Sequence, residues 1–232
     1  IRIASLFHES GRSKVIFYHD IHSDKQYTDM STPIELFKKH INIIRASGYE
    51  IVSKITKTHG QIEICFDDAF LGLYDNIKFI KEQNISIHLF VISSFLDIEN
   101  HINKEQLIEL NKLSQILISS HTHNHKILNK TSEIELIEEL KKSKDNLESL
   151  LNKKIVSICF PEGKFNDKVI EIAKQTGYKK MYSSLPGFYA NEITSGVKKR
   201  SLVQFAGEKE FKAILKGGDH ILAYWYKRKH IN

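Results

Sequence analysis

Short apolar runs alternate along the chain with longer stretches that carry apolar side chains on one face only. The apolar runs that predict buried strands are 15–18, 49–55, 61–66, 85–92, 116–119, 155–160, 178–182, 197–203 and 221–226. The amphipathic stretches that predict helices are 34–47, 71–83, 104–113, a long one that begins at 133, 167–176 and 208–215. Such alternation is typical of a parallel sheet whose faces are covered by helices. The pattern therefore predicts an α/β fold.

Local signals agree with these helix boundaries. Pro33 stands before the stretch 34–47, which ends at Gly48, and Ser132 forms a capping box with Glu135. No linker or repeat interrupts the alternation, so we expect residues 1–232 to form a single domain. The alternation fits an open doubly wound sheet and a closed barrel equally well. In both folds, the chemistry belongs at the carboxyl ends of the strands.

Three polar clusters stand directly after apolar runs. Asp67 and Asp68 follow the run 61–66, and the segment from His121 to His125 follows the run 116–119. Pro161-Glu162-Gly163 follows the run 155–160. Adjacent carboxylates beside a buried strand are costly unless they find partners or a cation. Neutral imidazole is the commonest protein ligand of metal ions, and two histidines with one carboxylate leave coordination positions open. Each cluster alone is a weak signal, but in this order they predict a catalytic metal site.

These motifs resemble those of the polysaccharide deacetylases of the NodB-homology type (carbohydrate esterase family 4). The family motif Thr-Phe-Asp-Asp-Gly corresponds to 65–69, His-Ser/Thr-x-x-His is intact at 121–125, and Arg-x-Pro-Tyr-Gly is reduced at 159–163. The opening segment 17–21 is also similar, and the resemblance spans residues 14 to 205. It implies a distorted (β/α) barrel of about seven parallel strands.

The resemblance also implies a reaction. Asp68, His121 and His125 would hold a divalent metal ion, Zn²⁺ in most members, with Co²⁺, Ni²⁺ or Fe²⁺ as alternatives. Asp67 would be the general base, and metal-bound water would be the nucleophile. The expected activity is hydrolysis of N-acetyl groups on a sugar of a polysaccharide or glycan precursor.

The chain departs from the family at the residues that support this chemistry. Ala69 replaces the glycine of the first motif, and Cys159 replaces the arginine that orients the catalytic aspartate. Arg200, which lies within the predicted strand 197–203, is our candidate for that task, and a surface arginine is the alternative reading. The late Leu-x-His motif, which supplies the general acid, is matched best by His220. His123, His19 or a water molecule are the alternatives.

We expect the substrate to contact residues after two of the strands. These residues are His19, Asp20, Pro161, Glu162 and Gly163. Glu162 replaces a pocket tyrosine and adds negative charge, which would favour a cationic or unusual substrate if it does not face solvent.

Composition limits the other possibilities. The 232 residues are 41% hydrophobic and 27% charged, as in ordinary globular proteins, and the net charge is +6. The basic clusters 198–200 and 227–229 keep the protein soluble or attract an anionic partner, but no nucleic-acid motif accompanies them. No run has the length of a transmembrane helix, and no signal-like segment is visible before the first strand in the given residues. A leader removed earlier would leave the same pattern, so both the cytoplasm and the cell envelope stay open.

The two cysteines and the late aromatic residues are explained most simply by roles in packing. Cys65 and Cys159 stand inside apolar runs, where we expect buried strand positions, with a disulfide or a metal site as the alternative. The aromatic run Tyr224-Trp225-Tyr226 predicts a packed terminal strand, with a sugar-stacking surface as the alternative.

Two other functions fit the same motifs. The reduced third motif would suit a catalytically weak or inactive glycan-binding protein, and a deacetylase of a non-sugar amine would carry the same metal ligands. The sequence leaves the sugar, its polymer length, the metal and the oligomeric state open.

Overall fold

The computed structural model describes residues 1, 11–191 and 196–230. Its strands are β1 (Lys14–Tyr18), β2 (Asp20–His22), β3 (Ser31–Pro33), β4 (Glu50–Val52), β5 (Gln61–Phe66), β6 (Ile87–Val91), β7 (Ile116–Ser120), β8 (Ser157–Cys159), β9 (Lys180–Tyr182), β10 (Val197–Lys198) and β11 (Ser201–Leu202). Its α-helices are α1 (Ile34–Ala46), α2 (Leu71–Asp75), α3 (Ile77–Glu82), α4 (Lys104–Asn111), α5 (Glu133–Leu151), α6 (Asp167–Gln175), α7 (Glu208–Leu215) and α8 (Ala223–His230). Short 3₁₀ turns lie at η2 (Leu128–Lys130), η3 (Pro161–Gly163) and η4 (Gly218–Leu222).

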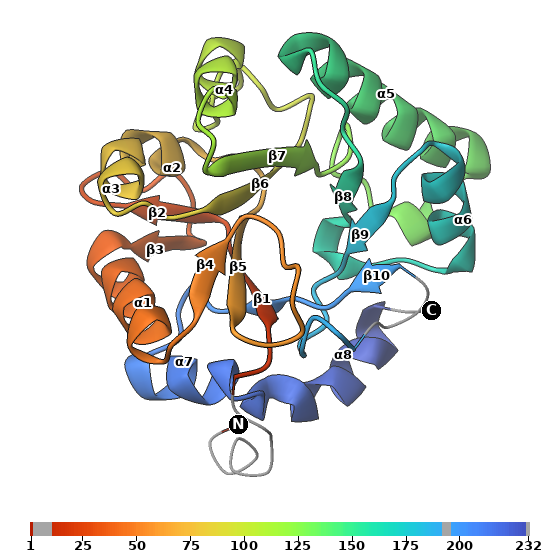
Figure 1. The fold of residues 1–232 in the computed structure, drawn as a ribbon. Helices are drawn as coiled ribbons and strands as arrows, with labels where there is room; N and C mark the ends of the chain where they lie inside the picture. Colours follow the sequence, from red (N-terminus) through yellow and green to blue (C-terminus); the bar gives the residue numbers. More distant parts are fainter. Residues whose placement is uncertain (2–10, 192–195, 231–232) are drawn as a thin grey trace.

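The strands form a parallel sheet that curls into a distorted barrel. The order is β10-β9-β8-β7-β6-β5-β1-β11, with β4 paired to β5, and every pairing is parallel. The first and last strands of this order, β10 and β11, are separated in sequence only by Lys199 and Arg200, which brings the two edges together. Figure 1 shows the helices arranged in a ring around the strands. The predicted barrel architecture is confirmed.

Alternation along the strands divides the apolar side chains into two cores. On β1, Val15 and Phe17 belong to a small cluster with Cys65, Phe90 and other buried residues inside the barrel. Their neighbours Ile16 and Tyr18 point the other way and belong to the larger cluster beneath the helices. Because both faces of the strands are buried, the runs are mainly apolar, with a few buried polar residues such as Glu63 and His88 among them.

The predicted helix starts are also observed. Ser132 accepts a hydrogen bond from the N–H of Glu135 and completes a capping box at the start of α5. The side chain of Asn166 caps α6 by accepting from the N–H of Val169. These bonds satisfy backbone donors that the helix itself leaves without partners.

Three of the predicted elements differ. The stretch 71–83 is two helices, because Asn76 ends α2 in a non-helical conformation and its side chain bonds the carbonyl of Gly72. The stretch 197–203 is two short strands that pair with opposite edges of the sheet. The run 221–226 is helical rather than extended, because it turns from η4 into α8. A short apolar run of this kind does not distinguish the periodicity of a strand from that of a helix.

Within residues 1, 11–191 and 196–230, no helix is both long enough and apolar enough to cross a bilayer.

Candidate active site

The site residues come from loops that follow neighbouring strands. Asp67 and Asp68 follow β5, the segment 121–125 follows β7, and η3 follows β8. Arg200 lies in the turn between β10 and β11. Since the strands are parallel, their carboxyl ends lie at one end of the barrel and bring these loops together.

Asp68, His121 and His125 converge as the sequence predicts. The Oδ1 atom of Asp68 is 3.4 Å from Nε2 of His121 and 3.6 Å from Nε2 of His125. In a tetrahedral zinc site with bonds of about 2.05 Å, two ligand atoms are about 3.3 Å apart. The three atoms are therefore spaced as ligands of one ion would be.

The chemistry of this donor set also fits a divalent cation. Oδ1 of Asp68 is buried and accepts no hydrogen bond from the described residues. Nδ1 of His121 is 2.8 Å from the carbonyl oxygen of Cys159, which can only accept, so Nδ1 carries the proton and Nε2 presents a lone pair. Burial lowers the pKa of His121 to about 4, which keeps the ring neutral at pH 7. His125 keeps 30% of its side chain exposed, so one side of the set is open.

Backbone strain gathers at the same loops. Asp68, Ala69, Thr122, His125 and Glu162 all have φ between 54° and 69°. Left-handed conformations cost L-residues about 1–2 kcal/mol each, and they persist where the surrounding structure imposes them. Their concentration in the three predicted clusters is typical of a functional site.

Glu139 of α5 holds the loop that carries the two histidines. Its carboxylate is buried and accepts hydrogen bonds from the N–H groups of His123 and Asn124 and from the Asn124 side chain. The sequence analysis did not identify Glu139 as a site residue. The feature that points to it is its position on the same helix face as Leu136 and Leu140, where an apolar residue would be expected.

Arg200 makes a bidentate contact with Asp67. Nη1 donates to Oδ1 and Nη2 to Oδ2, each at 2.7 Å, and both side chains are almost completely buried. Burial alone would raise the pKa of Asp67, but the guanidinium of Arg200 outweighs it and holds that pKa well below its usual range. Arg200 is fixed in turn by the carbonyl of Ser183 and by the rings of Phe17 and Phe90 on which it lies.

Cys159 lies beside this pair. Nη2 of Arg200 is 2.8 Å from its sulfur, and burial raises the pKa of the thiol well above its usual value. Cys65 and Cys159 are both free and buried in strands, as predicted. The position of the family arginine is therefore taken by a small side chain, and a guanidinium from β10–β11 reaches the aspartate instead.

A second group of metal-binding residue types lies inside the barrel. Glu63, Cys65 and His88 are mutually close and fully buried. However, both ring nitrogens of His88 are already engaged at 2.7 Å, one by Glu63 and one by Ser119. Asp68, His121 and His125 therefore form the better candidate centre.

The expected substrate residues divide into two sets. His19 and Glu162 line a cleft of about 360 Å³, and Pro161 and Gly163 are buried beside Glu162. Gly163 has φ +69°, and a Cβ there would lie 2.4 Å from the backbone N of Ser184, so only glycine fits. Asp20 does not reach the cleft, because its carboxylate is fully buried beside Ser31.

The three histidines suggested as general acid have different neighbours. His220 is in η4, and a Cβ on Gly187 would lie 3.5 Å from its Nδ1 atom. The Nδ1 atom of His123 is 2.8 Å from the hydroxyl of Ser93. The Nδ1 atom of His19 is 2.6 Å from Oε1 of Gln204, and His19 interacts electrostatically with Asp67.

Comparisons with known proteins agree with this geometry. The family described as polysaccharide deacetylase matches residues 54–181, more than half of the 232 residues. YxkH of Bacillus subtilis (strain 168) is 24% identical over an alignment of 184 residues, and the match covers 75% of this chain and 64% of YxkH. A poly-β-1,6-N-acetyl-D-glucosamine N-deacetylase of Staphylococcus aureus (strain MSSA476) is 30% identical over an alignment of 134 residues, and that match covers 52% of this chain and 46% of that enzyme. The chain thus spans less than two thirds of either relative.

A solved structure has the same fold. The Streptococcus pyogenes deacetylase PplD, in complex with acetate, superposes with a TM-score of 0.74 at 20% identity. The match covers 88% of this chain and 97% of PplD.

Proposed function

Because the chain belongs to the polysaccharide deacetylase family, we propose that it is a metal-dependent hydrolase that removes N-acetyl groups from sugar units of a polysaccharide or glycan precursor. The single observation that carries the proposal is the convergence of Asp68, His121 and His125 beside the Asp67–Arg200 pair. A poly-N-acetylglucosamine is the substrate we favour, since the S. aureus relative is named for that polymer.

Asp68, His121 and His125 would hold the divalent ion, with zinc suited to one carboxylate and two imidazoles. When bound, such an ion supplies Lewis-acid chemistry, which polarises an amide carbonyl and lowers the pKa of water. The carbonyl of Cys159 keeps the lone pair of His121 directed at the site.

Asp67 is the base that accepts a proton from the attacking water. Arg200 keeps its carboxylate ionised and fixes its plane through two contacts. The Arg200 contact supports an active enzyme rather than an inactive glycan-binding protein, because it supplies the guanidinium that the third motif lacks.

His19 is the donor that we assign to the leaving amine. It lines the cleft and interacts electrostatically with Asp67, and Gln204 holds its Nδ1. In its doubly protonated form, with Nδ1–H directed at Gln204, His19 would deliver the proton on Nε2 to the sugar nitrogen as the C–N bond breaks and acetate departs, and the neutral ring would then take a proton back from water.

Acetate release from β-1,6-linked N-acetylglucosamine oligomers tests this function. We expect Asp67→Asn to lower the rate by about 10³-fold or more, as loss of a catalytic base does. Asp97→Asn is the matched control, since Asp97 is a surface carboxylate paired with Lys104. Equal rates for wild type and Asp67→Asn, or no acetate from any N-acetylated glycan, would show that the proposal is wrong.

A further inference from the structure

Three large apolar side chains are exposed to water at η4 and α8. Ile221 is 53% exposed, Tyr224 is 64% exposed and Trp225 is 70% exposed. Trp225 is also the only tryptophan of the chain. Large aromatic side chains are mostly buried in folded proteins, so a group of them in contact with water marks an interaction surface. The reaction proposed above uses none of the three.

These side chains share one face of the two helical elements. Positions 221, 224, 225 and 228 follow the spacing of a single helix face across the junction of η4 and α8. Cζ of Arg228 is 5.7 Å from the ring centroid of Tyr224, which places this guanidinium on the same face. Tyr226 lies on the opposite side, where it packs against the larger core. The helix therefore has an inner face that holds it to the protein and an outer face that is aromatic.

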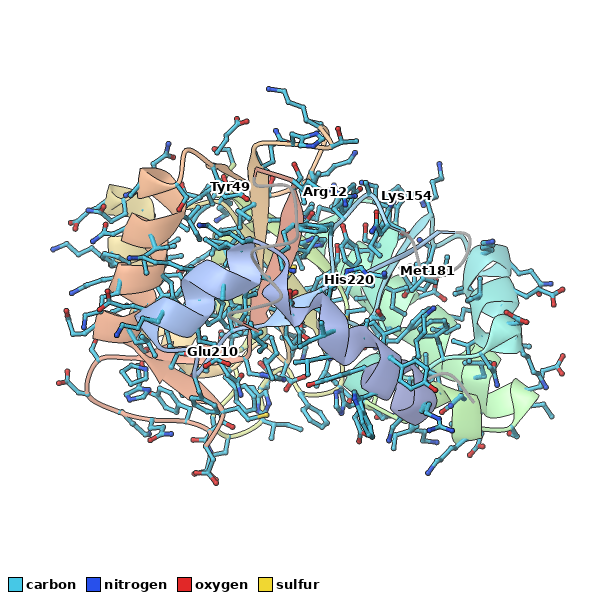
Figure 2. The ribbon with its side chains drawn as sticks, turned by 90° about the horizontal axis from the view of Figure 1, so that it is seen from below. Arg12, Tyr49, Lys154, Met181, Glu210 and His220 are labelled. Carbon is cyan, nitrogen blue, oxygen red and sulfur yellow. The ribbon has the colours of Figure 1, made fainter. Side chains whose placement is uncertain are left out.

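η4 anchors the outer face to the barrel. Asp219 of η4 accepts a hydrogen bond from Lys14 of β1 at 2.8 Å and one from Ser201 of β11 at 2.5 Å, and all three side chains are buried. Figure 2 shows α8, which follows His220, on the near side of the molecule with no other described element in front of it. The fold thus presents this face to the outside from a fixed element.

Basic residues accompany the aromatic ones. Lys227 and Arg228 are both exposed, and the sequence of α8 holds no acidic residue. Tryptophan and tyrosine favour the headgroup layer of a bilayer, and lysine and arginine beside them attract anionic lipids. Interfaces between proteins are depleted of lysine, so this combination of charge and aromatic surface fits a lipid surface better than a protein partner.

We propose that the outer face of η4 and α8, centred on Trp225, binds the surface of a membrane that contains anionic lipids. Tyr224 and Trp225 enter the headgroup layer, while Lys227 and Arg228 contact lipid phosphates. The attachment is peripheral, because a helix of this length extends about 12 Å and the hydrocarbon core of a bilayer is about 30 Å thick. It does not depend on the deacetylase reaction.

Tryptophan fluorescence tests the proposal directly, because the whole signal comes from Trp225. The protein would be titrated with vesicles of phosphatidylglycerol and phosphatidylcholine in equal parts, and separately with vesicles of phosphatidylcholine alone. We expect the emission to move to shorter wavelengths with the anionic vesicles, with an affinity that falls as salt is added. No shift with the anionic vesicles, or an equal shift with the neutral ones, would overturn the proposal. A shift with oligomers of N-acetylglucosamine but with neither kind of vesicle would assign the face to sugar instead.

Co-sedimentation with the anionic vesicles measures the contribution of each residue. We expect the affinity to fall about fivefold in Lys227→Gln and in Arg228→Gln, since each change removes one charge near the membrane surface. It should fall about tenfold or more in Trp225→Ala, which removes the largest apolar group. Phe205→Ala is the matched control, because Phe205 is an aromatic residue that is 60% exposed outside η4 and α8. Unchanged affinity in Trp225→Ala, or an equal loss in Phe205→Ala, would contradict the assignment.

Discussion

Arg200 and Asp67 lie 133 positions apart in the chain and meet through two parallel contacts of 2.7 Å. In the proposed active site this contact would take over from the arginine of the family's third motif, since Cys159 stands at that place with its sulfur 2.8 Å from the same guanidinium. The carboxylate of Asp67 would then keep its orientation although its support comes from a different segment.

Arg200→Lys should disrupt this support without removing the charge. A lysine makes a single point contact where arginine makes two, so the carboxylate of Asp67 gains freedom to rotate. We expect acetate release to fall about 10- to 100-fold, because small misplacements of a catalytic group have effects of that order. Arg45→Lys, the same change at an exposed residue that bonds Gln83, should have no effect. Retention of full activity in Arg200→Lys would contradict the role assigned to the pair.

His125→Ala should release the metal. Removal of one of three protein ligands leaves too few donors to hold an ion tightly. We expect metal content, measured by elemental analysis of the purified protein, to fall from about one ion per chain to near zero. His123→Ala is the comparison, because His123 is in the same loop but bonds Ser93. Equal metal contents in the two variants would contradict the ligand assignment.

Asp20 should make stability depend on pH. Burial raises the pKa of Asp20 from 3.8 to about 7. The folded state therefore favours the protonated form of Asp20. The stability that this group contributes to the folded protein is fully present below about pH 4 and is lost as pH rises towards about 7. Relative to Asp20→Asn, wild type should lose on the order of 2–4 kcal/mol of unfolding free energy between pH 4 and pH 8.

Urea unfolding of both metal-free proteins at these pH values measures that difference directly. The comparison with Asp20→Asn cancels the titration of all other groups that the two proteins share. A stability difference that stays constant from pH 4 to pH 8 would show that Asp20 is ionised in the folded protein throughout.

Ala69→Gly should stabilise the protein. Ala69 has φ +63°, a conformation that glycine adopts without strain. The relief should exceed the entropy that glycine adds to the unfolded chain, for a net gain of about 0.5–1 kcal/mol. Ala173→Gly in the middle of α6 should lose about 1 kcal/mol. Thermal unfolding shows whether each variant is more or less stable than wild type. A loss of stability in Ala69→Gly would be inconsistent with the left-handed backbone at this position.

Local signals predicted most of the strands and the closeness of Asp68, His121 and His125, whereas the barrel followed from the resemblance to the family, since the alternation alone fits an open sheet equally well. An apolar run followed at once by a carboxylate or histidine locates a strand end wherever the strands are parallel. Arg200 could be nominated because it is an arginine at a late predicted strand, where a guanidinium could replace the one that the third motif lacks.

Other features depend on tertiary packing that no local pattern contains. The position of Glu139 on the apolar face of α5 signals that it is buried, but it does not show that its carboxylate bonds the backbone of His123, sixteen positions away. His220 was nominated by a motif match alone, and its proximity to Gly187 follows from the fold and from no local pattern. The helical state of 223–230 follows from the continuation of η4, whereas its aromatic residues alone favour a strand.

The most direct test of the account is a crystal structure of the zinc-loaded protein with anomalous diffraction data at the zinc edge. We predict one strong peak within about 2.0–2.2 Å of Oδ1 of Asp68 and of Nε2 of both His121 and His125. A peak at Glu63, Cys65 and His88 instead, or no peak between the three predicted ligands, would contradict the central claim.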